Sequence, residues 1–221
     1  MNLGLVPYQE ALDLQHHLVA ARKEGRIDDV LILLEHPPVL TLGRRADETH
    51  IIASPDLLAR KGISVHRVER GGDVTYHGPG QLVGYPILDL RGYRQDVGWY
   101  VRSLEEVLLR VLTHFGIKGS LKDGLIGVWV GEAKIAAIGA RIERWVTYHG
   151  FALNVDPDMS HFQLIVPCGI ADKDVVSMSQ TLGRAVAPEE VRYHLVQCFS
   201  EVFDVILDDL DLTSLASTLG D

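Results

Sequence analysis

The chain has few cysteines, no surplus of basic residues and no long apolar run. Its two cysteines, Cys168 and Cys198, are too few for a disulfide framework, and reduced thiols fit the cytosol better. The formal net charge of -9 argues against a nucleic-acid platform. No apolar run approaches the roughly 18 to 20 residues of a membrane-spanning helix, and the acidic, histidine-containing N-terminus is unlike a secretory signal. We therefore expect a cytoplasmic protein with no membrane or nucleic-acid partner.

Two common ligand signatures are also missing. No GxxxxGK[ST] loop occurs, and the spacing of Gly78, Gly80 and Gly84 is one residue off the dinucleotide fingerprint. The residues that follow are predicted to be extended, so no helix N-terminus is available for a pyrophosphate. The sequence has no CxxC, HxxxH or HxE spacing, which argues against a metal site. We expect no cofactor and no metal.

The stretch from Arg70 to Ile87 has the most unusual composition in the chain, with five glycines and two prolines among polar residues. Gly71-Gly72 predicts a turn, and Asp73 to His77 predicts a short strand. Gly78-Pro79-Gly80 predicts a second turn, after which Gln81 to Leu90 is expected to be extended. The simple interpretation is a β-hairpin. The alternative is a glycine-floored concavity for an elongated organic ligand, because glycine in a strand often marks a close approach of another group.

The rest of the chain predicts an α/β fold with a mixed sheet and flanking helices in a single domain, residues 1–221. Helices are expected on one side of the sheet. They are predicted at 7–22, 54–61, 97–115 and 188–203, and further strands at 30–35, after 37–38 and at 63–68. Three segments between Gly124 and Val155 predict an antiparallel meander. The tail at 208–221 is polar enough to fray.

Cys168 and Lys134 are the candidate reactive side chains. Cys168 follows an apolar strand and lies between a proline and a glycine, where a thiol is exposed at a bend; Cys198, inside the last helix, is expected to be buried. Lys134 begins a strand of small apolar residues. A nearby ammonium favours a thiolate over a thiol. Position alone favours the simpler interpretation of Lys134 as a solvated lysine at a strand end.

His36, His77 and His149 all lie beside glycine or proline turns. Either His77 or His149 could form a thiol dyad with Cys168. The spacing does not favour a dyad or a metal site, so hydrogen bonds that shape a pocket are the preferred interpretation. The segment from Arg144 to Val155 combines aromatic residues with glycine and suggests a second wall opposite the first, or else a plain amphipathic strand.

Three segments together resemble the octanoyltransferases of lipoate biosynthesis. They are RGGDVTYHGPGQLVGYPI, KIAAIGARIERWVTYHGFALNV and PCGI, in this order and with these gaps, and the upstream TLGRRAD is similar to the same family. The resemblance covers residues 34–177. It implies the fold of the biotin and lipoate protein ligases. One departure is Val176-Ser177, where the family often has Thr-Ser.

The resemblance also implies roles for particular residues. Cys168 would be the nucleophile that takes the acyl group as a thioester, and Lys134 would lower the pKa of its thiol. The substrate-binding residues implied are Arg70, Gly71, Gly72, Asp73, Val74, Thr75, Tyr76, His77, Ala137, Ile138, Gly139, Gly150, Phe151 and Ala152. The donor would be octanoyl-acyl carrier protein. The acceptors would be apo lipoyl domains of 2-oxoacid dehydrogenase complexes and the glycine cleavage H protein.

This chemistry is consistent with the residues considered on their own. Acyl transfer in two steps needs a thiolate, an acid or base, an oxyanion donor and an apolar slot, and a thioester is already activated. No nucleotide is then required. Three other functions remain open: an ATP-dependent lipoate or biotin ligase, a Cys-His thioesterase or amidase, and a module that binds acyl carriers without catalysis.

Overall fold

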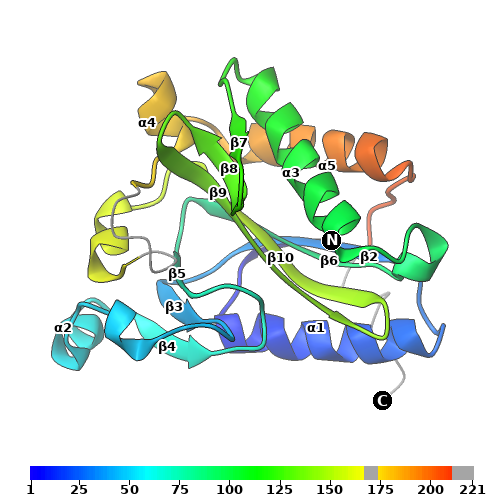
Figure 1. Ribbon diagram of the computed structural model, residues 1–221, viewed down its shortest axis with the longest axis horizontal. Coiled ribbons are helices and arrows are strands. Elements are labelled where there is room, and N and C mark those ends of the chain that lie inside the picture. Colours follow the sequence, from blue (N-terminus) through cyan, green and yellow to red (C-terminus); the bar gives the residue numbers. More distant parts are fainter. Residues whose placement is uncertain (167–173, 211–221) are drawn as a thin grey trace.

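The computed structural model describes residues 1–166 and 174–210, and within them the chain forms two β-sheets (Figure 1). The larger sheet has seven strands in the order β1-β2-β6-β10-β9-β8-β7, and the smaller has the order β4-β3-β5. The β1–β2 and β3–β4 pairs are parallel and the other neighbours are antiparallel. The predicted mixed sheet is confirmed. Within the described residues no helix is both long and apolar enough to cross a membrane.

The strands are β1 (Asn2–Leu5), β2 (Val30–Glu35), β3 (Val39–Leu42), β4 (Ser64–Arg67), β5 (Val74–His77), β6 (Gln81–Ile87), β7 (Ser120–Lys122), β8 (Leu125–Val130), β9 (Ala133–Glu143) and β10 (Val146–Asn154). The α-helices are α1 (Tyr8–Lys23), α2 (Pro55–Arg60), α3 (Val97–His114), α4 (Met178–Leu182) and α5 (Pro188–Phe203). Short 3₁₀ turns are η1 (Glu48–His50), η2 (Leu90–Gly92) and η3 (Met159–Leu164).

Local signals explain where several helices begin. The Ser54 side chain accepts a hydrogen bond from the Leu57 amide at the start of α2, and Asp96 does the same for Trp99 at the start of α3. Helix α5 begins at Pro188. Proline is favourable at the first helical position, because a backbone N–H at that position would have no hydrogen-bond acceptor within the helix. These helices agree with the sequence within one or two residues.

Helices cover both faces of the large sheet, so the expectation of helices on one side is wrong (Figure 1). Helices α3 and α5 pack on the face that carries Leu31, Leu33 and Leu153. Helix α1 packs on the opposite face, against Ile32 and Val83 among others. Successive side chains of a strand point to opposite faces of the sheet, and β2 is apolar on both faces. Each apolar face needs a covering layer, so helices pack on both sides.

The glycine-rich stretch is not a β-hairpin, although β5 and β6 are consecutive strands. Strand β5 pairs with β3 in the small sheet, whereas β6 lies between β2 and β10 in the large one. The turn at 78–80 therefore carries the chain from one sheet to the other. Gly80 has a φ of 84°, its amide donates to a Glu35 carboxylate oxygen, and its carbonyl accepts from the amides of Val155 and Asp156. The alternative concavity, bounded by two different sheets, fits this arrangement.

The predicted meander is confirmed, because β8, β9 and β10 are successive antiparallel neighbours. Strands β1 and β7 and helix α4 were not predicted. Each of the three is five residues or shorter. Segments of this length carry too few residues for a periodic pattern.

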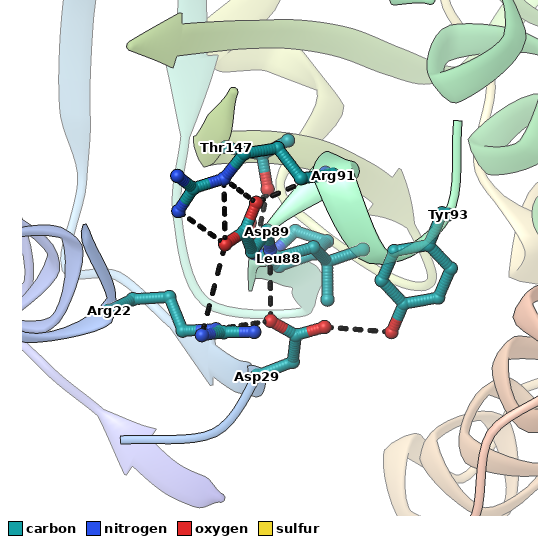
Figure 2. Close-up of polar contacts among 8 residues, drawn as sticks. Arg22, Asp29, Leu88, Asp89, Arg91, Tyr93 and Thr147 are labelled. Atoms are coloured by element: carbon teal, nitrogen blue, oxygen red, sulfur yellow. Dashed lines mark hydrogen bonds and ion pairs between the residues drawn. The ribbon is translucent and has the colours of Figure 1, made fainter. Parts of the chain in front are cut away.

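A polar network fixes the end of β6 that is remote from the glycine turn (Figure 2). The Asp29 carboxylate accepts hydrogen bonds from Arg22 Nε (2.6 Å), the Asp89 amide (2.9 Å) and the Tyr93 hydroxyl (2.8 Å). Arg91 donates to both carboxylate oxygens of Asp89. The network ties α1 to the start of β2 and the end of β6, and so holds the helix on its face of the sheet.

Asp89→Asn should lower the free energy of unfolding by about 1 kcal/mol or less at neutral pH, because the half-exposed Arg91 loses its charged acceptor. Hydrogen bonds from Arg91 hold the pKa of Asp89 below its ordinary value of 3.8. The contribution is therefore present above pH 3.8 and is lost as the pH falls through the lower folded-state pKa.

Urea unfolding at several pH values tests this prediction, with Asp123→Asn, on an exposed turn, as the control. The difference between wild type and Asp89→Asn should shrink below about pH 4. A difference that does not depend on pH would contradict the role given to the carboxylate charge.

Candidate active site

Lys134 lies at the start of β9 and is paired through its backbone with the segment that follows the PCGI motif. Its amide donates to the Asp174 carbonyl (2.8 Å), and its carbonyl accepts from the Val176 amide (3.0 Å). Its ammonium nitrogen lies 4.9 Å from the ring centroid of Trp129. Cys168, the predicted nucleophile, lies outside the described residues. Cys198 is buried in α5, as expected.

A chain of buried polar side chains connects His77 to the same segment. His77 Nδ1 lies 2.7 Å from the side-chain amide oxygen of Gln81. The side-chain amide nitrogen of Gln81 donates a hydrogen bond to Asn154 Oδ1 (2.9 Å). Asn154 in turn donates to the Val176 carbonyl (3.1 Å). Because an amide oxygen only accepts, Nδ1 of His77 carries the hydrogen and the lone pair of the neutral ring is on Nε2. The glycine stretch and Lys134 thus meet at Val176, where the sequence departs from the family pattern.

The loop from Arg70 to Gly72 packs directly on β9. Arg70 is buried, and its guanidinium donates to the hydroxyl and carbonyl oxygens of Thr41. The Gly71 amide donates to the Ala140 carbonyl (3.0 Å). A Cβ at Gly139 would lie 3.0 Å from the Gly71 carbonyl oxygen, so a larger residue there would push the loop away. Two of the three predicted binding segments are therefore in contact.

The third predicted segment is paired with the second. Gly150, Phe151 and Ala152 of β10 lie opposite Gly139, Ile138 and Ala137 of β9 in antiparallel register. Phe151 and Ile138 pack in the core beneath α3 and α5, while Ala152 faces α1. Any ligand on the α1 face would therefore meet Phe151 and Ile138 through their backbone.

The remaining predicted binding residues lie along β5 and just before it. Val74 and Tyr76 are buried in the core of the small sheet, where the Tyr76 hydroxyl lies 2.8 Å from His161 Nδ1. Thr75 is half-buried and paired with Thr41. Asp73 accepts from the Val74 amide and lies 2.7 Å from His50 Nδ1. Asp73 thus contacts the adjacent amide and the η1 turn.

His149 is fully buried within β10 and has a left-handed backbone, with φ of 53°. Its amide turns away from β6 and donates to the buried Gln15 side chain of α1 (2.7 Å). Neither ring nitrogen has a hydrogen-bond partner among the described residues. Burial lowers the pKa of His149 to about 3, with a further contribution from Arg70, and this outweighs the half-exposed Glu69 carboxylate 4.0 Å from Nε2.

Tyr8, His36 and Tyr85 extend this buried polar surface. The sequence named His36 among the candidate histidines, whereas it assigned neither Tyr8 nor Tyr85 to a site. His36 lies between the Val6 carbonyl and the Tyr85 hydroxyl, each at 2.7 Å, and the Tyr8 ring stands 5.1 Å from the His36 ring. Burial lowers the pKa of His36 to about 4 and that of His77 to about 3, and it raises the pKa of Tyr8 to about 12. All are neutral at pH 7. The proline turn beside His36 was the one available signal.

An open hollow of about 420 Å³ lies at the far end of β9 from Lys134. It is lined by Gly43, Arg44, Arg67, Val68, Glu69 and Arg141. Lys134 and Arg141 are seven residues apart in one strand, which corresponds to about 23 Å. The hollow therefore borders the Arg70 loop and does not include the candidate reactive lysine.

Residues 7–200 match the lipoyl protein ligase A/B catalytic domain family, and the chain belongs to this family. It is 52% identical to the octanoyltransferase of Nostoc punctiforme over 207 residues, 93% of this chain and 88% of that protein. It is 54% identical to the octanoyltransferase of Gloeobacter violaceus over 203 residues, 91% of this chain and 88% of that protein. The predictions of a resemblance to octanoyltransferases and of a transferase that acts on an acyl group are confirmed.

The fold is similar to that of a crystal structure of lipoate-protein ligase A bound with ATP. The TM-score is 0.76 at 18% sequence identity, and the likeness covers 99% of this chain and 91% of that one. The predicted fold of the lipoate protein ligase type is thereby confirmed.

The buried histidines should make the fold sensitive to mild acid. Their folded-state pKa values lie below the unfolded value of about 6.5, so the unfolded chain binds more protons than the folded chain in mild acid. The free energy of unfolding therefore decreases as the pH is lowered, by about 2 kcal/mol per histidine between pH 7 and pH 5. His149→Asn tolerates the left-handed backbone and removes one such group.

Urea unfolding between pH 7 and pH 5 checks this expectation. The dependence of the unfolding free energy on pH should become shallower by about one proton in His149→Asn. His17→Asn, at an exposed position on α1, serves as the control and should leave the slope unchanged. An unaltered slope in His149→Asn would show that its ring is already protonated in the folded state.

Proposed function

We propose that this protein transfers an octanoyl group from octanoyl-acyl carrier protein to a lysine of apo lipoyl domains. The relatives named octanoyltransferase, at more than half identity over most of the chain, support octanoyl transfer in protein lipoylation. The acceptors in this proposal are the lipoyl domains of 2-oxoacid dehydrogenase complexes and the glycine cleavage H protein. The observation that supports the proposed chemistry is the backbone pairing of Lys134 with Asp174 and Val176, because these residues belong to the segment that follows Cys168 in the chain.

The proposed reaction has two acyl-transfer steps. In the first, the Cys168 thiolate attacks the donor thioester, a new thioester forms on Cys168, and the carrier leaves as a thiolate that takes a proton from Lys134. In the second, the amine of an acceptor lysine attacks the Cys168 thioester. An amide bond forms, the Cys168 thiolate is released, and neutral Lys134 accepts the proton lost by the amine.

The polar surface around Arg70, His77 and His149 supports a role in substrate binding. Neutral histidines and protonated tyrosines accept and donate hydrogen bonds without the desolvation penalty of buried charges. Ala137 is a small residue on the face of β9 and β10 that also carries Ala152, and the Arg70 loop covers the neighbouring Gly139. An apolar chain with a polar thioester end suits a surface of this kind.

The first test is the mass of the intact protein after mixing with octanoyl-acyl carrier protein in the absence of ATP. We expect one octanoyl adduct, which disappears when an apo lipoyl domain is added while that domain gains the same mass. Cys168→Ser should form no thioester adduct, and Cys198→Ala is the matched control that should retain it. Full transfer by Cys168→Ser would show that the nucleophile assignment is wrong.

The same experiment separates the other functions. Transfer that requires ATP and free octanoate would favour a ligase, the activity named for the solved structure of similar fold. Release of free octanoate without acceptor modification would indicate a hydrolase. Tight binding of the carrier that survives loss of both Cys168 and Lys134, with no reaction, would indicate a binding module.

Lys134→Ala should raise the midpoint pH of Cys168 alkylation by about one unit or more, because a neighbouring cation stabilises a thiolate. The rate of iodoacetamide reaction against pH measures this midpoint, in a Cys198→Ala background so that one thiol reports. Lys118→Ala removes an exposed lysine and is the control. An identical profile in Lys134→Ala would remove this lysine from the activation of the thiol.

A further inference from the structure

Trp129 on β8 is a buried aromatic side chain that contacts two lysines. It is 1% exposed, and its ring centroid lies 4.9 Å from Lys134 Nζ and 5.1 Å from Lys122 Nζ. Its indole nitrogen has no hydrogen-bond partner among the described residues, so no such bond fixes the ring there. The face of a tryptophan ring attracts a cation more strongly than any other aromatic side chain, and most strongly where water is excluded.

The strand that carries Trp129 is irregular where the Lys134 side chain passes it. The pairing of β8 with β9 is irregular between Val128 and Trp129, and Gly127 just before it has a φ of 120°. A Cβ at Gly127 would lie 2.6 Å from the Ala136 carbonyl oxygen and 3.5 Å from Lys134 Cε. The glycine is therefore required by the close approach of the β9 backbone at Ala136, and the aliphatic part of Lys134 passes the same point at van der Waals distance before its ammonium reaches the indole.

A buried carboxylate holds this irregular point in place. Glu105 of α3 is 7% exposed, and its Oε1 accepts a hydrogen bond from the Gly127 amide (3.1 Å). The helix thus anchors the backbone next to the lysine. Gly127, Trp129 and Lys134 form one packed unit at the end of the meander.

The two lysines at this ring are held differently. Lys122 forms an ion pair with the exposed Glu132 carboxylate at 2.6 Å, at the outer edge of the sheet. Lys134 is bound through its backbone to Asp174 and Val176. One indole therefore contacts Lys134 of the candidate active site and Lys122 at the edge of the sheet. Substitutions of these two lysines can be compared, because both remove an ammonium group from the same ring.

We propose that Trp129 is a positioning residue for Lys134. The indole ring fixes the Lys134 ammonium through a cation–π contact, so that the ammonium can act on the Cys168 thiol. This inference rests on the proposed function, in which Lys134 acts on the Cys168 thiol. Trp129 itself is assigned no contact with the reacting atoms. It predicts that Trp129 matters for transfer only while Lys134 is present.

A double-mutant cycle tests this dependence, with single-turnover octanoyl transfer and the pH midpoint of Cys168 alkylation as readouts. Trp129→Leu should slow transfer roughly five- to thirtyfold, the range expected from a largely desolvated cation–π contact. It should also move the alkylation midpoint in the same direction as Lys134→Ala. In the Lys134→Ala background, Trp129→Leu should change neither readout further.

Two more variants guard against a loss of folding. Trp129→Phe keeps an aromatic face and should restore most of the rate lost in Trp129→Leu. Lys122→Gln removes the other ammonium from the same ring and should leave both readouts unchanged. Thermal unfolding of every variant reports whether the fold is intact.

The outcomes separate this inference from the proposed function. If Trp129→Leu slows transfer equally with and without Lys134, or has no effect, the positioning role is wrong although the lysine mechanism stands. If Lys134→Ala itself changes neither readout, the role of Lys134 in the proposed function is wrong, and the positioning role of Trp129 is wrong with it. If Trp129→Phe behaves like Trp129→Leu while folded, ring volume and not the aromatic face is what matters, and the inference is overturned.

Discussion

The contact between the Arg70 loop and β9 is the constraint on which the arrangement of the candidate site depends. The loop belongs to the small sheet and the strand to the large one, and they approach so closely that a Cβ at Gly139 would lie 3.0 Å from the Gly71 carbonyl oxygen. The Gly71 amide then reaches the Ala140 carbonyl, and the buried guanidinium of Arg70 is satisfied by Thr41. These hydrogen bonds link the loop to both sheets and give the buried guanidinium acceptors for its donors.

A second connection holds the other end of the same strand. The side chains of His77, Gln81 and Asn154 form a continuous buried chain that ends on the Val176 carbonyl, and the Val176 amide binds Lys134. Removing one member of such a chain leaves its neighbours unsatisfied, which costs about 1 to 3 kcal/mol for each buried group. The position of Lys134 therefore depends on residues in β5, β6 and β10.

Much of this architecture could be predicted from local patterns, and the rest depends on contacts between distant segments. The meander from Leu125 to Asn154 and helix α5 follow from periodicity and turn residues. The turn at Gly78–Gly80 was misleading, because the same turn residues serve a hairpin or a crossing between sheets, and the partner of β5 lies at 39–42. Tyr8 carries no signal of its own, since an aromatic residue on a helix stripe usually marks the core.

The separation of charge along β9 links the fold to the chemistry. At one end, Lys134 packs on an indole, and at the other, Arg141 borders an open hollow. Burial keeps His149 on the neighbouring strand β10 and His77 on β5 of the small sheet neutral. These neutral rings add no charge to the surface between the two ends of the strand. In the proposed function, the charge that activates the thiol comes from the end of the strand where Lys134 meets the segment after the PCGI motif.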